Sequence, residues 1–188
     1  MARPLLASLG MNFIKLFCCL AAIILISNDS YAASWDVVVN GKAFHLDSDR
    51  DWNEDNWGLG FEREFAGHRW VPFVVGNGFR DSMNHMSYMG GGGLKRRFRP
   101  GGWMRDLHVD IGLVGFVMRR QNIRDGNPFP GLLPVVSIGN RRAALNLTYL
   151  PGSAVDSVTD RKRVDPNMDG VLFLQAKFSF DYFLPSVR

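Results

Sequence analysis

Short runs in which apolar residues occupy every second position are the feature that most constrains the fold of this chain. In residues 107–119, Leu107, Val109 and Ile111 share one face, because alternate side chains of a strand point the same way. Gly, Pro, Asn and Asp separate such runs, and a sustained helical period is missing. We expect strands over residues 36–46, 56–65, 70–79, 86–98, 107–119, 132–139, 142–150 and 170–180. These eight strands predict an all-β fold. Because their number is even, we expect a closed barrel: an eight-stranded antiparallel transmembrane outer-membrane β-barrel.

The first 32 residues are typical of a secretory signal peptide. Lys15 precedes an apolar run over residues 16–26, and residues 30–32 place small side chains at the −3 and −1 positions of a cleavage site. The run is shorter than the about 20 apolar residues of a membrane-spanning helix. We expect residues 1–32 to be removed and residues 33–188 to form one barrel domain, exported through the periplasm to the outer membrane of a Gram-negative cell.

Composition excludes several classes of function. Cys18 and Cys19 both lie in the predicted signal peptide, so the mature chain would have no disulfide. Removing Arg3, Lys15 and Asp29 with that peptide lowers the formal charge from +4 to +3, which is too small an excess to indicate nucleic-acid binding. The spacing of histidines and acids does not indicate a metal site, and we expect no cofactor.

The second face of the strands predicts a lumen with two different halves. In residues 107–119 this face begins with His108 and Asp110 and ends with Phe116 and Met118. Because neighbouring strands run in opposite directions, the periplasmic half of the lumen should be polar and the outer half apolar or small. The apolar half either fills a narrow barrel core or forms a cavity for hydrocarbon. Buried charges need partners, so we expect an internal ion network of Glu62, Glu64, Asp110, Lys95, Arg97 and Lys177.

Three residues at the predicted outer rim could carry acyl-transfer chemistry. His45 ends the first strand and Asp81-Ser82 follows the third, and both strands run outward. His titrates near neutral pH and could act as a base. Ser could be a nucleophile or a donor to a developing oxyanion, and Asp could orient the imidazole or an acceptor hydroxyl. The alternative is that His45 is an ordinary loop histidine and that Asp81-Ser82 is only a turn.

Five motifs, in order and spacing, resemble the lipid A palmitoyltransferase family (PagP). They cover most of residues 44–180 and comprise Trp52–Phe61, Phe79–Asn84, Gly91–Gly93 followed by Phe98–Pro100, Leu132–Gly139 and Thr148–Gly152. The resemblance implies a monomeric outer-membrane enzyme that needs no cofactor or metal. Such an enzyme moves a palmitoyl-type acyl chain from a glycerophospholipid donor to the lipid A of lipopolysaccharide, with no nucleic-acid partner.

The resemblance also assigns roles to residues. The essential His, Asp and Ser of the family correspond to His45, Asp81 and Ser82, which we expect to be catalytic. The resemblance also implies four residues that bind substrate. Pro134 and Pro151 border a lateral gate for lipid, and Gly91 and Gly93 belong to the acyl pocket, with Gly93 at its floor.

The chain also departs from the family pattern. The N-terminal amphipathic helix is missing, Asn40 and Asn56 replace a second pair of gate prolines, and no acid between Phe65 and Trp70 matches the one used near lipopolysaccharide. We expect residues 153–169 to be a patternless external loop. The departures leave a rival hypothesis, a non-catalytic lipid-binding or structural outer-membrane barrel.

Overall fold

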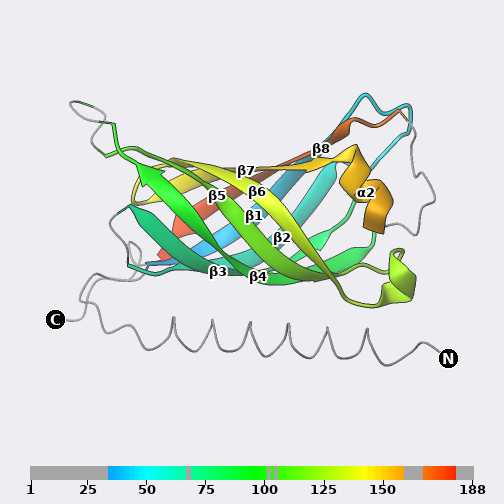
Figure 1. The fold of residues 1–188 in the computed structure, drawn as a ribbon, viewed down its shortest axis with the longest axis horizontal. Coiled ribbons are helices and arrows are strands. Elements are labelled where there is room, and N and C mark those ends of the chain that lie inside the picture. The colour runs from blue at the N-terminus through cyan, green and yellow to red at the C-terminus, as the bar shows by residue number, and fades with distance from the viewer. Residues whose placement is uncertain (1–33, 67–68, 101–102, 104–105, 159–166, 181–188) are drawn as a thin grey trace. The chain divides into compact units, whose positions relative to one another are not determined.

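The computed structural model describes residues 34–66, 69–100, 103, 106–158 and 167–180. The predicted signal peptide lies outside the described residues. The described chain forms eight antiparallel strands that close into a barrel in sequence order, with β1 and β8 side by side (Figure 1). The strands are β1 (Ser34–Leu46), β2 (Asp55–Glu64), β3 (Trp70–Arg80), β4 (Met86–Phe98), β5 (His108–Arg119), β6 (Phe129–Gly139), β7 (Ala143–Pro151) and β8 (Gly170–Ser179).

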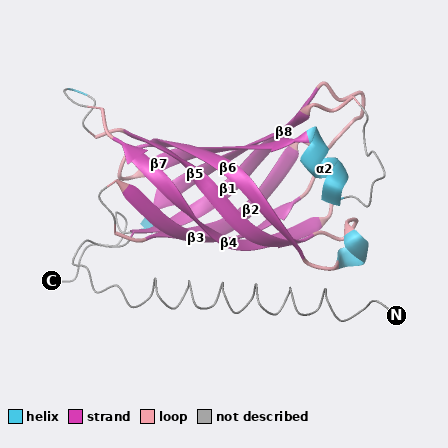
Figure 2. Cartoon of the chain, in the orientation of Figure 1, coloured by secondary structure: helices cyan, strands magenta, loops and turns pink. Residues whose placement is uncertain are grey.

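This architecture confirms the predicted fold, and the strand bounds agree closely. The largest difference is at β6, which begins at Phe129 rather than at residue 132. One prediction was wrong: residues 152–158 form the helix α2 (Gly152–Val158) and are not a patternless loop (Figure 2). Seven residues are too few to show a helical period, and Val155 packs against a small cluster with Met168 and Val171. Residues 159–166 of that segment lie outside the described part.

One further short element lies among the described residues. A 3-10 turn, η2 (Arg124–Gly126), lies between β5 and β6. Within the described ranges, no helix is long and apolar enough to cross a membrane.

We call the end of the barrel that carries the segments after β1, β3, β5 and β7 the loop end, and the opposite end the turn end. The loop end therefore carries η2 and α2, which Figure 1 shows at the same side of the barrel.

The outer surface of the barrel is apolar. Leu59, Leu113 and Leu132 are each more than half exposed and point away from the lumen. Exposed aromatic side chains lie near both ends, with Trp35 and Trp70 at the turn end and others such as Trp57 and Tyr88 at the loop end. An apolar band between aromatic girdles is the surface of a barrel that faces lipid.

In contrast to the apolar outer surface, the lumen at the turn end is lined by charged side chains. Lys95 is 1% exposed, and its Nζ lies 2.8 Å from carboxylate oxygens of both Glu62 and Glu64. Arg97 bridges Glu64 at 2.8 Å and Asp110 at 2.7 Å. Lys177 pairs with Asp36, Glu62 and Glu64. The predicted internal ion network is therefore present.

Nearer the loop end the lumen becomes apolar, as expected. The main buried cluster contains Phe73, Val75, Val114, Phe116, Leu133 and Val135 from β3, β5 and β6. Eight strands leave a narrow interior, so these side chains fill much of it.

The barrel wall is incomplete between β6 and β7. Their ladder runs from Gly139↔Ala144 to Val135↔Thr148 and goes no further among the described residues. Residues 129–134 of β6 remain paired with β5, and residues 149–151 of β7 remain paired with β8. We call this opening the β6–β7 gap. Pro134 borders it on one strand and Pro151 lies in it on the other, and proline cannot donate to a ladder.

Candidate active site

His45 lies at the loop end and is held by an aromatic neighbour. It is the penultimate residue of β1, and its ring stacks on the Trp52 indole with 5.0 Å between centroids and 12° between planes. Trp52 in turn donates from Nε1 to Ser48 Oγ at 2.7 Å. The short segment after β1 therefore folds back over the histidine and fixes the plane of its ring.

The same segment is tied to the end of β3. The backbone N–H of Asn53 donates to the Ser82 carbonyl at 3.1 Å, and its side-chain amide donates to the Asp81 carbonyl at 3.1 Å. Asn56 donates to the carbonyl of Arg80 at 2.7 Å. These bonds bring the part of the chain that follows His45 against the Asp81-Ser82 pair, so the three predicted residues share one rim.

The Asp81 carboxylate is buried, 1% exposed, and accepts four hydrogen bonds. Oδ1 accepts from the backbone N–H groups of Met83 and His85 at 2.9 and 3.0 Å, and Oδ2 accepts from Ser87 Oγ at 2.8 Å and Arg120 Nε at 3.3 Å. Burial by itself would raise the pKa of Asp81. The nearby Arg120 guanidinium and the hydrogen bonds outweigh burial and hold that pKa below its ordinary value.

This carboxylate organises the turn that carries Ser82. The Asp81 N–H donates to the His85 carbonyl at 2.8 Å, and the Asn84 N–H donates to the Asp81 carbonyl at 2.9 Å. Asn84 has a φ of 66°, a left-handed conformation that Asn tolerates better than most residues. The turn is thus a fixed platform for the half-buried Ser82, and the predicted turn and the predicted site coincide.

Two cavities meet at His45. The rim cavity, of about 250 Å³, is lined by His45, Asp81, Ser82 and a largely apolar wall that includes Phe116, Leu133 and Phe173. The loop cavity, of about 410 Å³, lies among polar residues of the segment after β1. Its lining comprises His45, Ser48, Arg50, Asp51, Trp52, Asn53, Glu54 and Asp55. The His45–Trp52 pair borders both cavities and so stands between an apolar space and a polar one.

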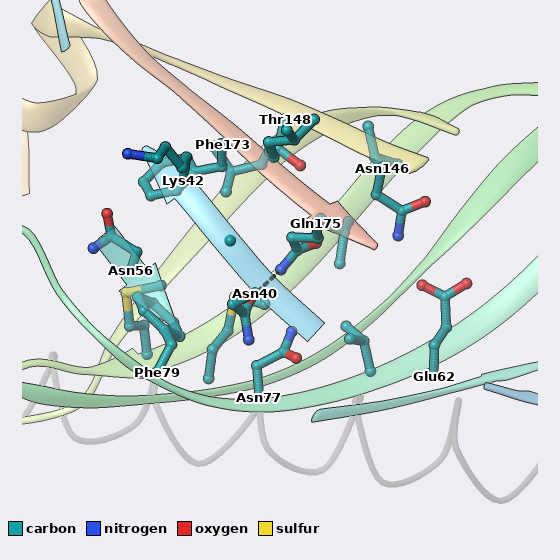
Figure 3. Close-up of a pocket in the computed structure, with 18 of the residues that line it drawn as sticks. Asn40, Lys42, Asn56, Glu62, Asn77, Phe79, Asn146, Thr148, Phe173 and Gln175 are labelled. Carbon is teal, nitrogen blue, oxygen red and sulfur yellow. Dashed lines mark hydrogen bonds between the residues drawn. The ribbon is translucent and has the colours of Figure 1, made fainter. Parts of the chain in front are cut away.

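A third, smaller cavity continues into the barrel. This inner cavity, of about 70 Å³, shares Phe79, Met118, Leu133 and other residues with the rim cavity. Its lining includes amides as well as apolar side chains, and Figure 3 shows Asn40, Asn77 and Gln175 grouped within it.

The predicted substrate-binding residues lie close to the cavities without lining them. A Cβ at Gly93 would come within 2.1 Å of the Leu113 carbonyl oxygen and 2.8 Å of the Phe73 ring. One at Gly91 would come within 2.3 Å of the Gly115 carbonyl oxygen and 2.8 Å of Phe116 Cβ, so both positions are too tight for a side chain. Phe73 lines the inner cavity and Phe116 the rim cavity. The two prolines border the β6–β7 gap, as described above.

Sequence reasoning missed several residues of this site. Trp52 was noted as part of a motif, but its contact with His45 was not predicted, and neither was the contact of Arg120 with Asp81. Asn77 was not considered, although an amide between Val75 and Phe79 on the inward face of β3 is an available signal.

One carboxylate cluster has the spacing of a cation site. Asp36, Glu62 and Glu64 each offer an oxygen within 4.8 Å of the others. Lys177 Nζ lies within 3.4 Å of all three residues. An ammonium group therefore already balances these acids, and the cluster is part of the ion network.

Comparisons with known proteins identify the family of this chain. A sequence model of the family described as "Antimicrobial peptide resistance and lipid A acylation protein PagP" matches residues 27–159, more than half of the chain. The "Lipid A acyltransferase PagP" of Bordetella pertussis (strain Tohama I / ATCC BAA-589 / NCTC 13251) is 33% identical over 129 residues, which is 66% of this chain and 67% of that protein. The protein of the same name from Methylobacillus flagellatus (strain ATCC 51484 / DSM 6875 / VKM B-1610 / KT) is 30% identical over 129 residues, 66% of each chain.

Among solved structures, Neisserial surface protein A (NspA) matches with a TM-score of 0.42 and 12% identity, over 79% of this chain and 96% of that one. The order of the motifs, the closed eight-stranded barrel and the match to the family model over residues 27–159 lead to one assignment. The chain belongs to the PagP family.

Proposed function

We propose that this protein is an outer-membrane acyltransferase that moves a palmitoyl-type acyl chain from a glycerophospholipid to lipid A. Membership of the PagP family and the names of its relatives, lipid A acyltransferases, support acylation of lipid A. The observation that carries the proposal is the place of His45, which borders an apolar cavity on one side and a polar cavity on the other. A base in that place can reach a lipid ester and a sugar hydroxyl together.

The apolar outer surface supports a place in the outer membrane, reached through the periplasm after removal of residues 1–32. We place the loop end at the cell exterior, where lipid A occupies the outer leaflet. Among the described residues the strands leave unpaired edges only at the short β6–β7 gap, which supports a monomer.

The chemistry follows from the two cavities. The donor acyl chain lies in the rim cavity with its ester carbonyl near Ser82, and the lipid A hydroxyl enters from the loop cavity, whose acids can accept hydrogen bonds from a sugar. His45 takes the proton of that hydroxyl, and the hydroxyl oxygen bonds to the carbonyl carbon. The ester C–O bond then breaks, and the lysophospholipid oxygen leaves with the proton from His45. Ser82 donates a hydrogen bond to the transient oxyanion.

Asp81 acts as a positioning residue in this scheme. Both of its oxygens already accept hydrogen bonds from the turn, Ser87 and Arg120, so its part is to hold Ser82 in place. The donor chain reaches the rim cavity sideways through the β6–β7 gap. Leu132 and Leu133 of β6 and Leu150 of β7 line the rim cavity along this gap.

One observation favours the rival, a lipid-binding barrel without catalysis. Asp81 has a complete structural role as the acceptor of the turn, so its presence does not require chemistry. The rival predicts that lipid binds and that no acyl chain is transferred.

Transfer of labelled palmitoyl groups from phosphatidylcholine to lipid A in mixed micelles tests the proposal. We expect His45→Ala and Ser82→Ala each to lower the rate at least about 100-fold, the usual effect of losing a catalytic base or an oxyanion donor. His85→Ala is the matched control, because this half-buried rim histidine lines neither cavity and should keep near-normal activity. A folded His45→Ala protein with normal transfer would remove His45 from the mechanism, and a wild-type protein without transfer would favour the rival.

A further inference from the structure

The inner cavity carries polar groups where a pocket for a plain hydrocarbon chain should have none. Asn40, Asn77 and Asn146 are 7%, 6% and 3% exposed. Asn40 Nδ2, Asn146 Oδ1 and both side-chain polar atoms of Asn77 are buried without a hydrogen-bond partner in the described structure. Unsatisfied buried amides are rare in folded proteins because each costs desolvation energy, so several in one cavity indicate that something polar binds there.

These amides come from three strands and face one space. Asn40 is on β1, Asn77 on β3 and Asn146 on β7, and all three line the inner cavity. Figure 3 shows the Gln175 amide, from β8, bonded to Asn40. Gln175 donates to Asn40 Oδ1, which leaves the Nδ2 group of Asn40 available as a donor.

The amide atoms that have no hydrogen-bond partner determine which kind of ligand can bind in the inner cavity. They offer two amide donors, on Asn40 and Asn77, and carbonyl acceptors on Asn77 and Asn146. Asn56, which lines the inner and the rim cavity, offers a further carbonyl acceptor. The lining has two charged residues, and both already have partners: Glu62 is bonded to Lys95 and Lys177, and Lys42 pairs with Asp55. A neutral group that both donates and accepts fits such a set, and a hydroxyl is the smallest group that does so.

The route to these amides begins at the candidate active site. The rim cavity and the inner cavity share five lining residues: Asn56, Phe79, Met118, Leu133 and Phe173. An acyl chain anchored at the rim would first meet apolar side chains and would reach the amides with its distal half. The inner wall also includes Val75 and Val114, so the cavity suits a chain that is mostly hydrocarbon.

We propose that the inner cavity recognises an acyl chain that carries a hydroxyl group in its distal half, so that the preferred donor is a hydroxyacyl glycerophospholipid. This proposal rests on the proposed acyl transfer and specifies the substrate class of that site. The hydroxyl accepts from Asn77 or Asn40 and donates to Asn146 or Asn77. A plain chain of equal length would leave these amides unpaired, and sites built to bond a hydroxyl discriminate strongly against analogues that lack it.

The test uses phosphatidylcholines with saturated chains of graded length, each offered with and without one hydroxyl in the distal half. Transfer to lipid A is measured in mixed micelles. In parallel, the matching free fatty acids are added to the protein and the shift of its Tm is recorded, because a ligand that binds the folded state raises Tm. We expect at least about ten-fold faster transfer from the hydroxylated donor at the best chain length, and a larger Tm shift with the hydroxylated acid.

Asn77→Leu provides the decisive variant. Leu has nearly the same shape as Asn and no polar side-chain atoms, so the variant should fold. It should lose the preference for the hydroxyl, with transfer from the hydroxylated and the plain donor becoming equal. Asn127→Leu is the matched control, since Asn127 is an exposed amide beside η2 that lines neither cavity, and it should keep the preference. If Asn77→Leu does not fold, Asn146→Leu replaces it.

The outcomes separate this inference from the proposed function. Equal transfer from both donors by the wild-type protein, with equal Tm shifts, would overturn the inference and assign the amides to bound water, while the acyltransferase proposal stands. Absence of transfer from every donor, with a larger Tm shift for the hydroxylated acid, would overturn the acyltransferase proposal and uphold the hydroxyl site.

Discussion

Replacement of Lys95 by Met tests how strongly the internal ion network stabilises the barrel. Met keeps most of the length and volume of the Lys side chain but removes its charge. Glu62 and Glu64 each lose a hydrogen bond of 2.8 Å, and Asp110 loses an ammonium group 4.0 Å away. The network then contains four carboxylates, from Asp36, Glu62, Glu64 and Asp110, against the two cations Arg97 and Lys177.

Removal of one partner from a buried ion pair costs about 3–5 kcal/mol, because the remaining charge stays buried without compensation. Lys177 still contacts both glutamates, so we expect a loss near the lower limit, about 3 kcal/mol in the free energy of unfolding. Burial also shields the pair from salt, so the loss should hardly change between low and high ionic strength.

Urea unfolding in lipid vesicles, followed by tryptophan fluorescence, measures this loss. Lys42→Met is the matched control, because Lys42 pairs with Asp55 at 2.9 Å while their side chains are 50% and 74% exposed. An exposed pair contributes about 0–1 kcal/mol, and salt weakens it further. A Lys95→Met protein that unfolds at the same urea concentration as the Lys42→Met protein would refute the reasoning.

Three further predictions concern the rim, the wall and the pocket. The pKa of Asp81 is lowered in the folded state. The ionised carboxylate should therefore stabilise the fold above the ordinary carboxyl pKa, and this stabilisation should be lost as the pH falls through the pKa of Asp81 in the folded protein. Asp81→Asn should weaken this dependence of the Tm on acid pH. A disulfide between Pro134→Cys and Tyr149→Cys should close the β6–β7 gap and block acyl transfer until it is reduced. Gly93→Met should lower stability by about 3 kcal/mol or more, because its Cβ would come within 2.1 Å of the Leu113 carbonyl oxygen; in the folded fraction its side chain should displace the Phe73 ring and shift transfer to shorter acyl chains, as a chain-length series would show.

The gap prediction has a control in the intact part of the same wall. Val136 and Leu147 are opposite each other in the β6–β7 ladder, so a disulfide between cysteines at these positions would bridge strands that are already paired. It should leave transfer unchanged. Unchanged transfer in the Pro134–Tyr149 cross-linked protein would instead show that lipid enters elsewhere.

The sequence was sufficient to predict the barrel because its main signal is local. Alternation of apolar residues is a property of neighbouring positions, and it predicted the strand bounds and which side chains face inward. The even number of strands and their alternating directions then placed Glu62, Glu64 and Lys95 in one half of the lumen and His45, Asp81 and Ser82 at one rim. Each strand pairs with the next, and the pairing of β8 with β1 closes the barrel, which an even number of alternating strands allows to be antiparallel.

The contacts that make a site at this rim came only from the tertiary structure. Asp81 meets Arg120, which is 39 residues away in the sequence, and Asn53 bonds to the carbonyl of Ser82 across two loops. The stacking of Trp52 on His45 and the meeting of amides from β1, β3 and β7 likewise depend on loop geometry and strand register. Alternation specifies the face of a side chain but not its neighbours across the lumen, because these depend on how far each strand is shifted against the next.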